Sequence, residues 1–155
     1  MLEYLLKLLW TYKVYEYNFQ NIHWQARGGI NLCVHTKSQE HYEYAQESID
    51  EIAERIMQLE WIIPMAMCEL VEKSAIQFLS TCPDMEWVVR DMLATQSSMI
   101  DFLKGWIKQS TEDYWTEDLL RKLCAWHEKQ RWLIGTLFPK KSTNEKPDPE
   151  SIKKD

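Results

Sequence analysis

Turn-forming residues are scarce in this chain, and long stretches of it repeat their apolar residues every three to four positions. The 155 residues include only 4 glycines and 5 prolines, about half of what average usage supplies. Tight turns must therefore be few. A chain with few turns and an apolar period near 3.6 residues folds into long helices. No strand-like alternation interrupts this pattern, so the sequence predicts an all-α protein.

Start and stop signals divide the chain into four long helical runs. Gly28 and Gly29 follow the first run, Pro64 stops the second, Pro83 opens the third and Thr116 can cap the fourth. An apolar segment between the second and third runs predicts one short extra helix. The predicted ranges are 2–26, 35–62, 65–79 for the short helix, 83–108 and 116–138. Four long helices with short connections favour a four-helix bundle.

The chain length fits a single domain. A protein of 155 residues can bury a sufficient core without disulfides, so residues 1–138 are expected to form the bundle. The remaining residues, 139–155, are polar and contain three of the five prolines. They are expected to form a disordered tail.

Charge and composition exclude several classes of protein. The net charge of −6 has the wrong sign for a surface that binds phosphates along its length. The C-terminal tail is nearly neutral, so DNA binding is expected to be weak or absent. The longest apolar run, residues 61–68, is far shorter than the roughly 18 residues of a membrane span. Scattered cysteines and the lack of a signal-peptide pattern predict a cytoplasmic protein with reduced thiols.

One face of the 35–62 helix gathers residues that can bind metals. At about 100° per residue, His35, Gln39, Asp50 and Glu54 point at about 0°, 40°, 60° and 100°. The pairs His35–Glu54 and Gln39–Asp50 have the same midpoint along the helix. If a second copy of this helix crossed the first antiparallel at that midpoint, the histidine end of each helix would lie opposite the glutamate end of the other. Two identical sites about 22 Å apart would result. The alternative is an ordinary solvated helix face.

The ligand types at this face suit iron, manganese or zinc, because imidazole and carboxylate groups bind all three. Di-iron centres inside a four-helix bundle use a Glu-x-x-His pattern on two helices. That pattern does not occur in this chain. Any metal site must therefore be built differently.

Two sequence motifs flank this face. His23-Trp24-Gln25-Ala26-Arg27-Gly28 precedes His35, and Asp50-Glu51-Ile52-Ala53-Glu54-Arg55 follows it. Over about residues 4–138, Trp132 included, the chain resembles the Dps family of mini-ferritins in the ferritin-like superfamily. The resemblance implies a ferritin-like bundle, a hollow shell of twelve subunits and a ferroxidase site shared across a twofold axis. It places His23 and His35 in one subunit and Asp50 and Glu54 in the other.

The chain departs from the family's pattern at Gln39, where the family has an aspartate. A neutral amide oxygen binds a hard cation more weakly than a carboxylate does. The second iron should therefore bind poorly, and oxidation should be attenuated. Glu43, four residues later, is a candidate replacement ligand, directly or through water. Its alternative is an ordinary exposed helix residue.

The resemblance also suggests roles for residues outside this face. Trp24, next to His23, is a candidate to quench oxidising species. Four acidic residues near the start of the last helix are expected to line the threefold pores of the shell, although a helix-cap role would also explain them. These pore residues are Glu112, Asp113, Glu117 and Asp118.

The remaining aromatic and histidine residues are expected to be structural. The other seven tryptophans are expected to be core residues. His41 and His127 have no evident partners in the sequence and are interpreted as structural. Four tyrosines are expected to serve packing or an interface: Tyr4, Tyr12, Tyr15 and Tyr17.

The resemblance implies a ferroxidase that protects against oxidative damage. Fe²⁺ would enter by the acidic pores, bind at the intersubunit site, be oxidised by peroxide or oxygen, and be stored as ferric mineral in the shell. Iron is then the expected cofactor and substrate. The alternative, which Gln39 favours, is a shell protein with a weakened or inactive centre that acts as a DNA-binding, nucleoid or structural protein.

Overall fold

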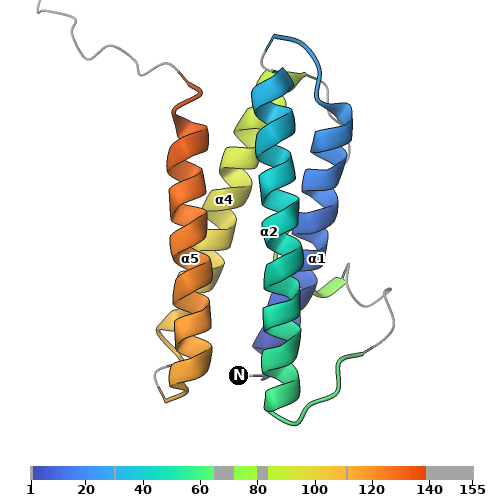
Figure 1. The fold of residues 1–155 in the computed structure, drawn as a ribbon. Helices are drawn as coiled ribbons and strands as arrows, with labels where there is room; N and C mark the ends of the chain where they lie inside the picture. The colour runs from blue at the N-terminus through green and yellow to red at the C-terminus, as the bar shows by residue number, and fades with distance from the viewer. Residues whose placement is uncertain (1, 30, 65–71, 80–83, 111, 139–155) are drawn as a thin grey trace, which may run out of the picture.

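Four long α-helices lie side by side in an elongated bundle (Figure 1). The computed structural model describes residues 2–29, 31–64, 72–79, 84–110 and 112–138. Its long helices are α1 (Leu2–Gln25), α2 (Asn31–Gln58), α4 (Met85–Ile107) and α5 (Tyr114–Gly135). The predicted all-α four-helix bundle is confirmed. None of the described helices combines the length and the apolar run that crossing a bilayer requires.

The helices form two antiparallel pairs. α1 packs mainly on α2, and α4 packs mainly on α5. A turn at one end of the bundle joins the first pair, and a turn at the opposite end joins the second (Figure 1). α2 and α4 start at the same end and run parallel. One connection must therefore return along the bundle, as in four-helix bundles with a single long crossover.

A left-handed residue ends α2 earlier than the sequence predicts. Glu60 has φ 61°, and two backbone hydrogen bonds close the turn around it. Trp61 N–H donates to Ile56 C=O, and Glu60 N–H donates to Met57 C=O. This pairing satisfies carbonyls that the helix end would otherwise leave free. The predicted end at residue 62, just before Pro64, was therefore wrong by about one turn.

Aspartates cap the last two helices. Asp84 accepts a hydrogen bond from Trp87 N–H at the start of α4, where the sequence predicts a helix start. At α5 the cap is Asp113, which accepts from the backbone N–H of Thr116. The prediction that Thr116 caps this helix was wrong, since Thr116 is buried inside its first turn. α2 begins at Asn31, four residues before the predicted start.

The described segment before α4, residues 72–79, is mostly irregular rather than helical. Of residues 72–79, only 72 and 73 are helical, and the rest is held against α1 by side chains. Asn18 donates to Gln77 C=O and accepts from Leu79 N–H, while Thr11 accepts from Ala75 N–H. The predicted short helix is therefore absent from 74–79, and its part in 65–71 lies outside the described residues. The predicted disordered tail, 139–155, also lies outside them.

α1 supplies much of the apolar core. Tyr4, Tyr12 and Tyr15 are buried as expected, whereas Tyr17 is 51 % exposed. Burial of a large apolar side chain contributes about 1.5–3 kcal/mol, so this helix carries a large share of the stability. The largest fully buried side chains are Tyr4, Leu5, Leu8, Tyr12, Tyr15, Phe19, Ile52, Ile56, Met92, Met99, Ile100 and Leu103.

Several tryptophans are not core residues. Trp10 is buried, but Trp61, Trp115 and Trp132 are 46 %, 77 % and 67 % exposed in the single chain. The expectation that these three lie in the core was therefore wrong. Large indole surfaces left open on one chain are typical of contacts between chains.

A buried polar network crosses the middle of the bundle. We call Tyr12, Tyr15, His41, Gln96 and His127 the core network; all five are completely buried, and they come from all four helices. His127 Nδ1 donates to Gln96 Oε1 (2.7 Å), so its Nε2 accepts from the Tyr12 hydroxyl (2.8 Å). Gln96 Nε2 donates to the Tyr15 hydroxyl (2.9 Å), which in turn bonds His41 Nδ1.

The network shows that both interior histidines have hydrogen-bond partners. The sequence shows no evident partners for His41 and His127, but the structure supplies them, and the interpretation of both as structural residues is compatible with these bonds. Desolvation lowers the pKa of His127 to about 3 and holds the pKa of His41 well below its usual value. Both imidazoles are therefore neutral in the folded chain near neutral pH.

We predict that this chain loses stability as the pH falls from about 6.5. Below that value the unfolded chain binds a proton at His127 that the folded chain does not bind until about pH 3. The free energy of unfolding should therefore decrease by about 1.4 kcal/mol per pH unit for this histidine. Urea unfolding at pH 7, 6 and 5 measures the slope.

The matched variant is His127→Gln, which keeps a neutral hydrogen-bonding side chain. Its unfolding free energy should fall less steeply with acidification, by about 1.4 kcal/mol per pH unit. Equal slopes in the two proteins would contradict a neutral, buried His127.

Candidate metal centre

Two histidine rings stack where α1 passes into α2. His23 lies in the last turn of α1 and His35 lies near the start of α2. Their ring centroids are 3.7 Å apart, and the ring planes differ by 21°. The chain reverses between them through Gly28, whose φ of 86° is strained for any residue with a side chain.

Reciprocal hydrogen bonds select the tautomer of both rings. His23 Nδ1 lies 2.9 Å from the carbonyl oxygen of His35, and His35 Nδ1 lies 2.9 Å from the carbonyl oxygen of His23. A carbonyl can only accept, so each Nδ1 carries a proton, and the neutral form of each ring has its lone pair on Nε2. This is the arrangement by which proteins orient histidine ligands for metals. Two imidazoles that can present Nε2 to a metal therefore lie side by side.

Gln39 and Glu43 interact directly on the next turns of α2. Gln39 Nε2 donates to Glu43 Oε1 at 2.7 Å. The bond uses the amide nitrogen and leaves the amide oxygen, which is the atom of Gln39 that can bind a cation. Both side chains are exposed. Glu43 therefore places a negative charge beside Gln39 and orients its amide.

The carboxylates predicted to complete the site lie far along the same helix. Asp50 and Glu54 are exposed, and a 15-residue separation along a helix corresponds to about 22 Å. Within the described part of the chain, no three His, Cys, Asp or Glu residues are grouped closely enough to hold a metal. A single chain therefore brings His23 and His35 together but does not bring Asp50 and Glu54 to them.

Two aromatic residues flank the histidine pair, and the sequence analysis missed one of them. Trp24 follows His23 and is 64 % exposed. Tyr42 is half-buried, and its ring meets the ring of His23 nearly at right angles, with centroids 5.4 Å apart. Tyr42 lies seven residues after His35, which is two helical turns, so the two share a face. This seven-residue spacing is the feature of the sequence that could have indicated Tyr42 as a neighbour of the histidine pair.

The acidic residues near α5 are divided between internal contacts and solvent. Asp113 binds both its helix and Arg55, whose guanidinium nitrogen lies 2.8 and 3.0 Å from the two carboxylate oxygens. Burial alone would raise the pKa of Asp113, but hydrogen bonds from Thr116 and Arg55 outweigh it and hold the pKa below the usual value. Glu117 pairs with Arg121. The other two predicted pore residues, Glu112 and Asp118, are exposed.

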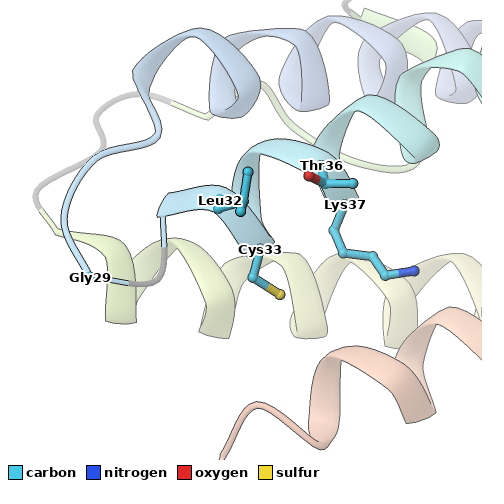
Figure 2. A pocket seen from close by; sticks show the side chains of 5 residues that line it. All are labelled: Gly29, Leu32, Cys33, Thr36 and Lys37. Carbon is cyan, nitrogen blue, oxygen red and sulfur yellow. The ribbon is translucent and has the colours of Figure 1, made fainter.

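A shallow apolar pocket on the first turns of α2 is separate from the histidine pair. Figure 2 shows its lining. Cys33 precedes His35 by two positions, which on a helix is about 200° around the axis. The pocket therefore does not coincide with the predicted ligands. Its lining residues are Gly29, Leu32, Cys33, Thr36 and Lys37.

Comparison with known proteins identifies both the family and the fold. The family model for the ferritin-like domain matches residues 2–141. Among curated proteins, the chain is 30 % identical to "DNA protection during starvation protein 2" of Bacillus anthracis over 136 residues. That match covers 86 % of this chain and 93 % of the relative.

Solved structures of Dps proteins share the architecture. The chain is similar to Dps from Listeria monocytogenes, with a TM-score of 0.82 and 24 % identity over 88 % of this chain and 91 % of that one. It is also similar to Dps from Staphylococcus aureus, with a TM-score of 0.84 and 21 % identity over 89 % and 94 % of the two chains. These matches show that the described helices adopt a ferritin-like bundle.

We predict that Asp113→Ala destabilises the fold by about 2 kcal/mol, because it removes the α5 cap and leaves the Arg55 guanidinium without its carboxylate. Asp118→Ala is the matched control, since it removes an exposed acid in the same helix and should change the free energy of unfolding by less than about 0.5 kcal/mol. Urea unfolding at pH 7 measures both. Equal losses would contradict the cap and ion-pair assignment.

Proposed function

The chain belongs to the Dps family of the ferritin-like superfamily, and from this premise we propose that it is a mini-ferritin that oxidises Fe²⁺ at a site shared between two subunits. The oxidant is peroxide or oxygen. Ferric iron is stored in a hollow shell of twelve subunits, which protects against oxidative damage. Iron is here the substrate and the stored cargo.

The histidine pair is the observation that carries the proposal. The ring of each histidine, His23 and His35, donates a hydrogen bond from Nδ1 to the backbone carbonyl of the other. Both Nε2 atoms therefore stay available to a metal. The same bonds tie the end of α1 to the start of α2, and the tautomer they select is the one that a pair of metal-binding imidazoles requires. The pair needs carboxylates to complete a site of mixed nitrogen and oxygen ligands, which suits iron.

A second copy supplies those carboxylates. When two α2 helices cross antiparallel about a twofold axis, each histidine pair lies opposite Asp50 and Glu54 of the partner chain. The exposure of both carboxylates and of His35 in the single chain is compatible with such a contact. Two imidazoles and two carboxylates balance the charge of one Fe²⁺, which is therefore the tightly held metal.

Gln39 weakens the second metal position. Its amide oxygen binds a second Fe²⁺ without contributing charge, and Glu43 both orients the amide and supplies a nearby negative charge. The bond to Gln39 occupies Oε1 of Glu43 and leaves its other carboxylate oxygen, Oε2, for a metal. Peroxide needs two electrons and each Fe²⁺ supplies one, so weak occupancy of this position slows the reaction.

The exposed side chains also support an assembled shell. Trp61, Trp115 and Trp132 leave large indole surfaces open on the single chain, and contacts between subunits bury such surfaces. Glu112 and Asp118 are the exposed acids available to an iron-entry pore. Asp113 and Glu117 are each paired with an arginine, so they contribute to the pore mainly through their electric field.

We predict that His35→Ala and Glu54→Ala each abolish tight iron binding and oxidation, because each removes a ligand of the better-held iron. Anaerobic Fe²⁺ titration followed by peroxide addition measures both. Glu51→Ala is the control for Glu54→Ala. It also removes one carboxylate from α2, but that carboxylate pairs with Lys122 of α5. It should bind and oxidise iron like the unmodified protein. Equal loss in all three variants would contradict the site.

We predict that Gln39→Asp raises the iron bound per site from about one to about two and speeds oxidation, because it restores a carboxylate at the second position. The same titration counts the metal, and stopped-flow absorbance follows oxidation. If Gln39→Asp changed neither quantity while Glu43→Ala lowered both, Glu43 would be the second ligand. If the unmodified protein bound no Fe²⁺ while Gln39→Asp did, the native chain would be a shell protein with an inactive centre.

A further inference from the structure

We propose that Arg55 is a positioning residue for the metal centre. By its bonds to Asp113 and Thr116 of α5, it holds the end of α2 that presents two carboxylates to the partner chain. Those carboxylates belong to Asp50 and Glu54. This inference rests on the proposed function, and it starts from a difference between the two halves of the site.

The two halves of the site are held differently in the single chain. His23 and His35 fix each other through reciprocal hydrogen bonds. Asp50 and Glu54 are exposed, and in the part of the chain that the structure describes neither carboxylate has a hydrogen bond or an ion pair. The geometry of this half therefore depends on how firmly the helix beneath the two carboxylates is held.

Every nitrogen of the Arg55 guanidinium donates a hydrogen bond. Nη2 donates to both carboxylate oxygens of Asp113 (2.8 and 3.0 Å), Nε donates to Thr116 Oγ1 (2.9 Å) and Nη1 donates to Gln58 Oε1 (3.1 Å). The Thr116 hydroxyl gives its own proton to Asp113 (2.6 Å), so these three side chains form a closed ring of bonds. The side chains of Arg55 and Asp113 are only 14 % and 24 % exposed, so solvent screens this pair less than it screens a surface ion pair.

Arg55 transmits this restraint to the ligands because it follows Glu54 directly in α2. Adjacent helical side chains point about 100° apart, so Glu54 remains exposed while Arg55 faces α5. α2 packs mainly on α1, and hence a fork that reaches α5 limits rotation of this end of α2 about its axis. Such a rotation would carry Asp50 and Glu54 away from the histidines of the partner chain.

Two other polar contacts join α2 and α5 but are less suited to this role. Glu51 pairs with Lys122, but both side chains are largely exposed, and an ammonium lacks the planar fork of a guanidinium. Gln130 donates to Glu40, which lies about 21 Å from Glu54 by helical rise. Arg55 is therefore the contact that can fix the carboxylate end of α2.

The test compares Thr116→Val with Thr116→Ser in the assembled full-length protein, by anaerobic Fe²⁺ titration followed by peroxide addition. Thr116→Val keeps the shape of the buried side chain but removes the hydroxyl between Arg55 and Asp113, whereas Thr116→Ser keeps it. Thr116→Val should raise the Fe²⁺ dissociation constant and the apparent KM about tenfold, as is typical when a group that orients a metal ligand is lost. The oxidation rate at saturating Fe²⁺ should change less than about twofold, because the ligands themselves remain. Thr116→Ser should match the unmodified protein.

A second variant and a control act on the same helix contact. Arg55→Lys keeps the charge but loses the fork, so it should weaken Fe²⁺ binding in the same way. Lys122→Met breaks only the exposed ion pair with Glu51 and should leave Fe²⁺ affinity unchanged. Circular dichroism and light scattering at the titration temperature establish that each variant is folded and assembled.

The possible failures are distinguishable. Unchanged Fe²⁺ affinity in a folded, assembled Thr116→Val or Arg55→Lys overturns the role of Arg55 alone. An equal loss of affinity in Lys122→Met also overturns it, because any weakening of the contact between α2 and α5 would then suffice. So does loss of the assembly in both variants, since the contact would then serve the fold rather than ligand position. An unmodified protein that binds no Fe²⁺ overturns the proposed function as well.

Discussion

The stacked contact between His23 and His35 is the interaction on which the candidate metal centre depends. It exists because the chain reverses through Gly28 and lays α2 against α1. Each ring then reaches the backbone carbonyl of the other. Two helix ends are thereby tied to one another, and two nitrogen lone pairs are fixed before any metal arrives. A ligand pair oriented in advance does not lose side-chain freedom when the metal binds.

The rigidity of α2 explains why the proposed metal site needs a second chain. A helix of 28 residues cannot bend its own carboxylates back to its own histidines, since a straight helix keeps them about 22 Å apart. The interior of the bundle cannot host the metal in their place. Two tyrosines, two histidines and a glutamine already fill its centre and bond to one another. The proposed metal site therefore lies on the surface of α2, where a second copy would complete it.

The core network has a cost and a benefit. Burying neutral histidines makes the fold sensitive to acid, whereas apolar residues of similar size would not. In return, the network ties all four helices at one level and gives them a defined register, a role that buried polar groups are known to fill in some bundles. Register matters here because the positions of His23, Tyr42 and His35 depend on how α1 and α2 are aligned.

The sequence by itself determined the four long helices, the shared face of α2 and the pairing of its residues about one centre. Those features are local, because a fixed rotation and rise per residue convert spacing directly into position. Only the tertiary structure decided the tautomers of His23 and His35, the bond between Gln39 and Glu43, the contact of Tyr42 with His23 and the partners of His41 and His127. The partners of His127 lie 31 and 115 residues away in the sequence. Such contacts depend on how separate helices pack and on which way each side chain turns, and no periodicity within one helix contains that information.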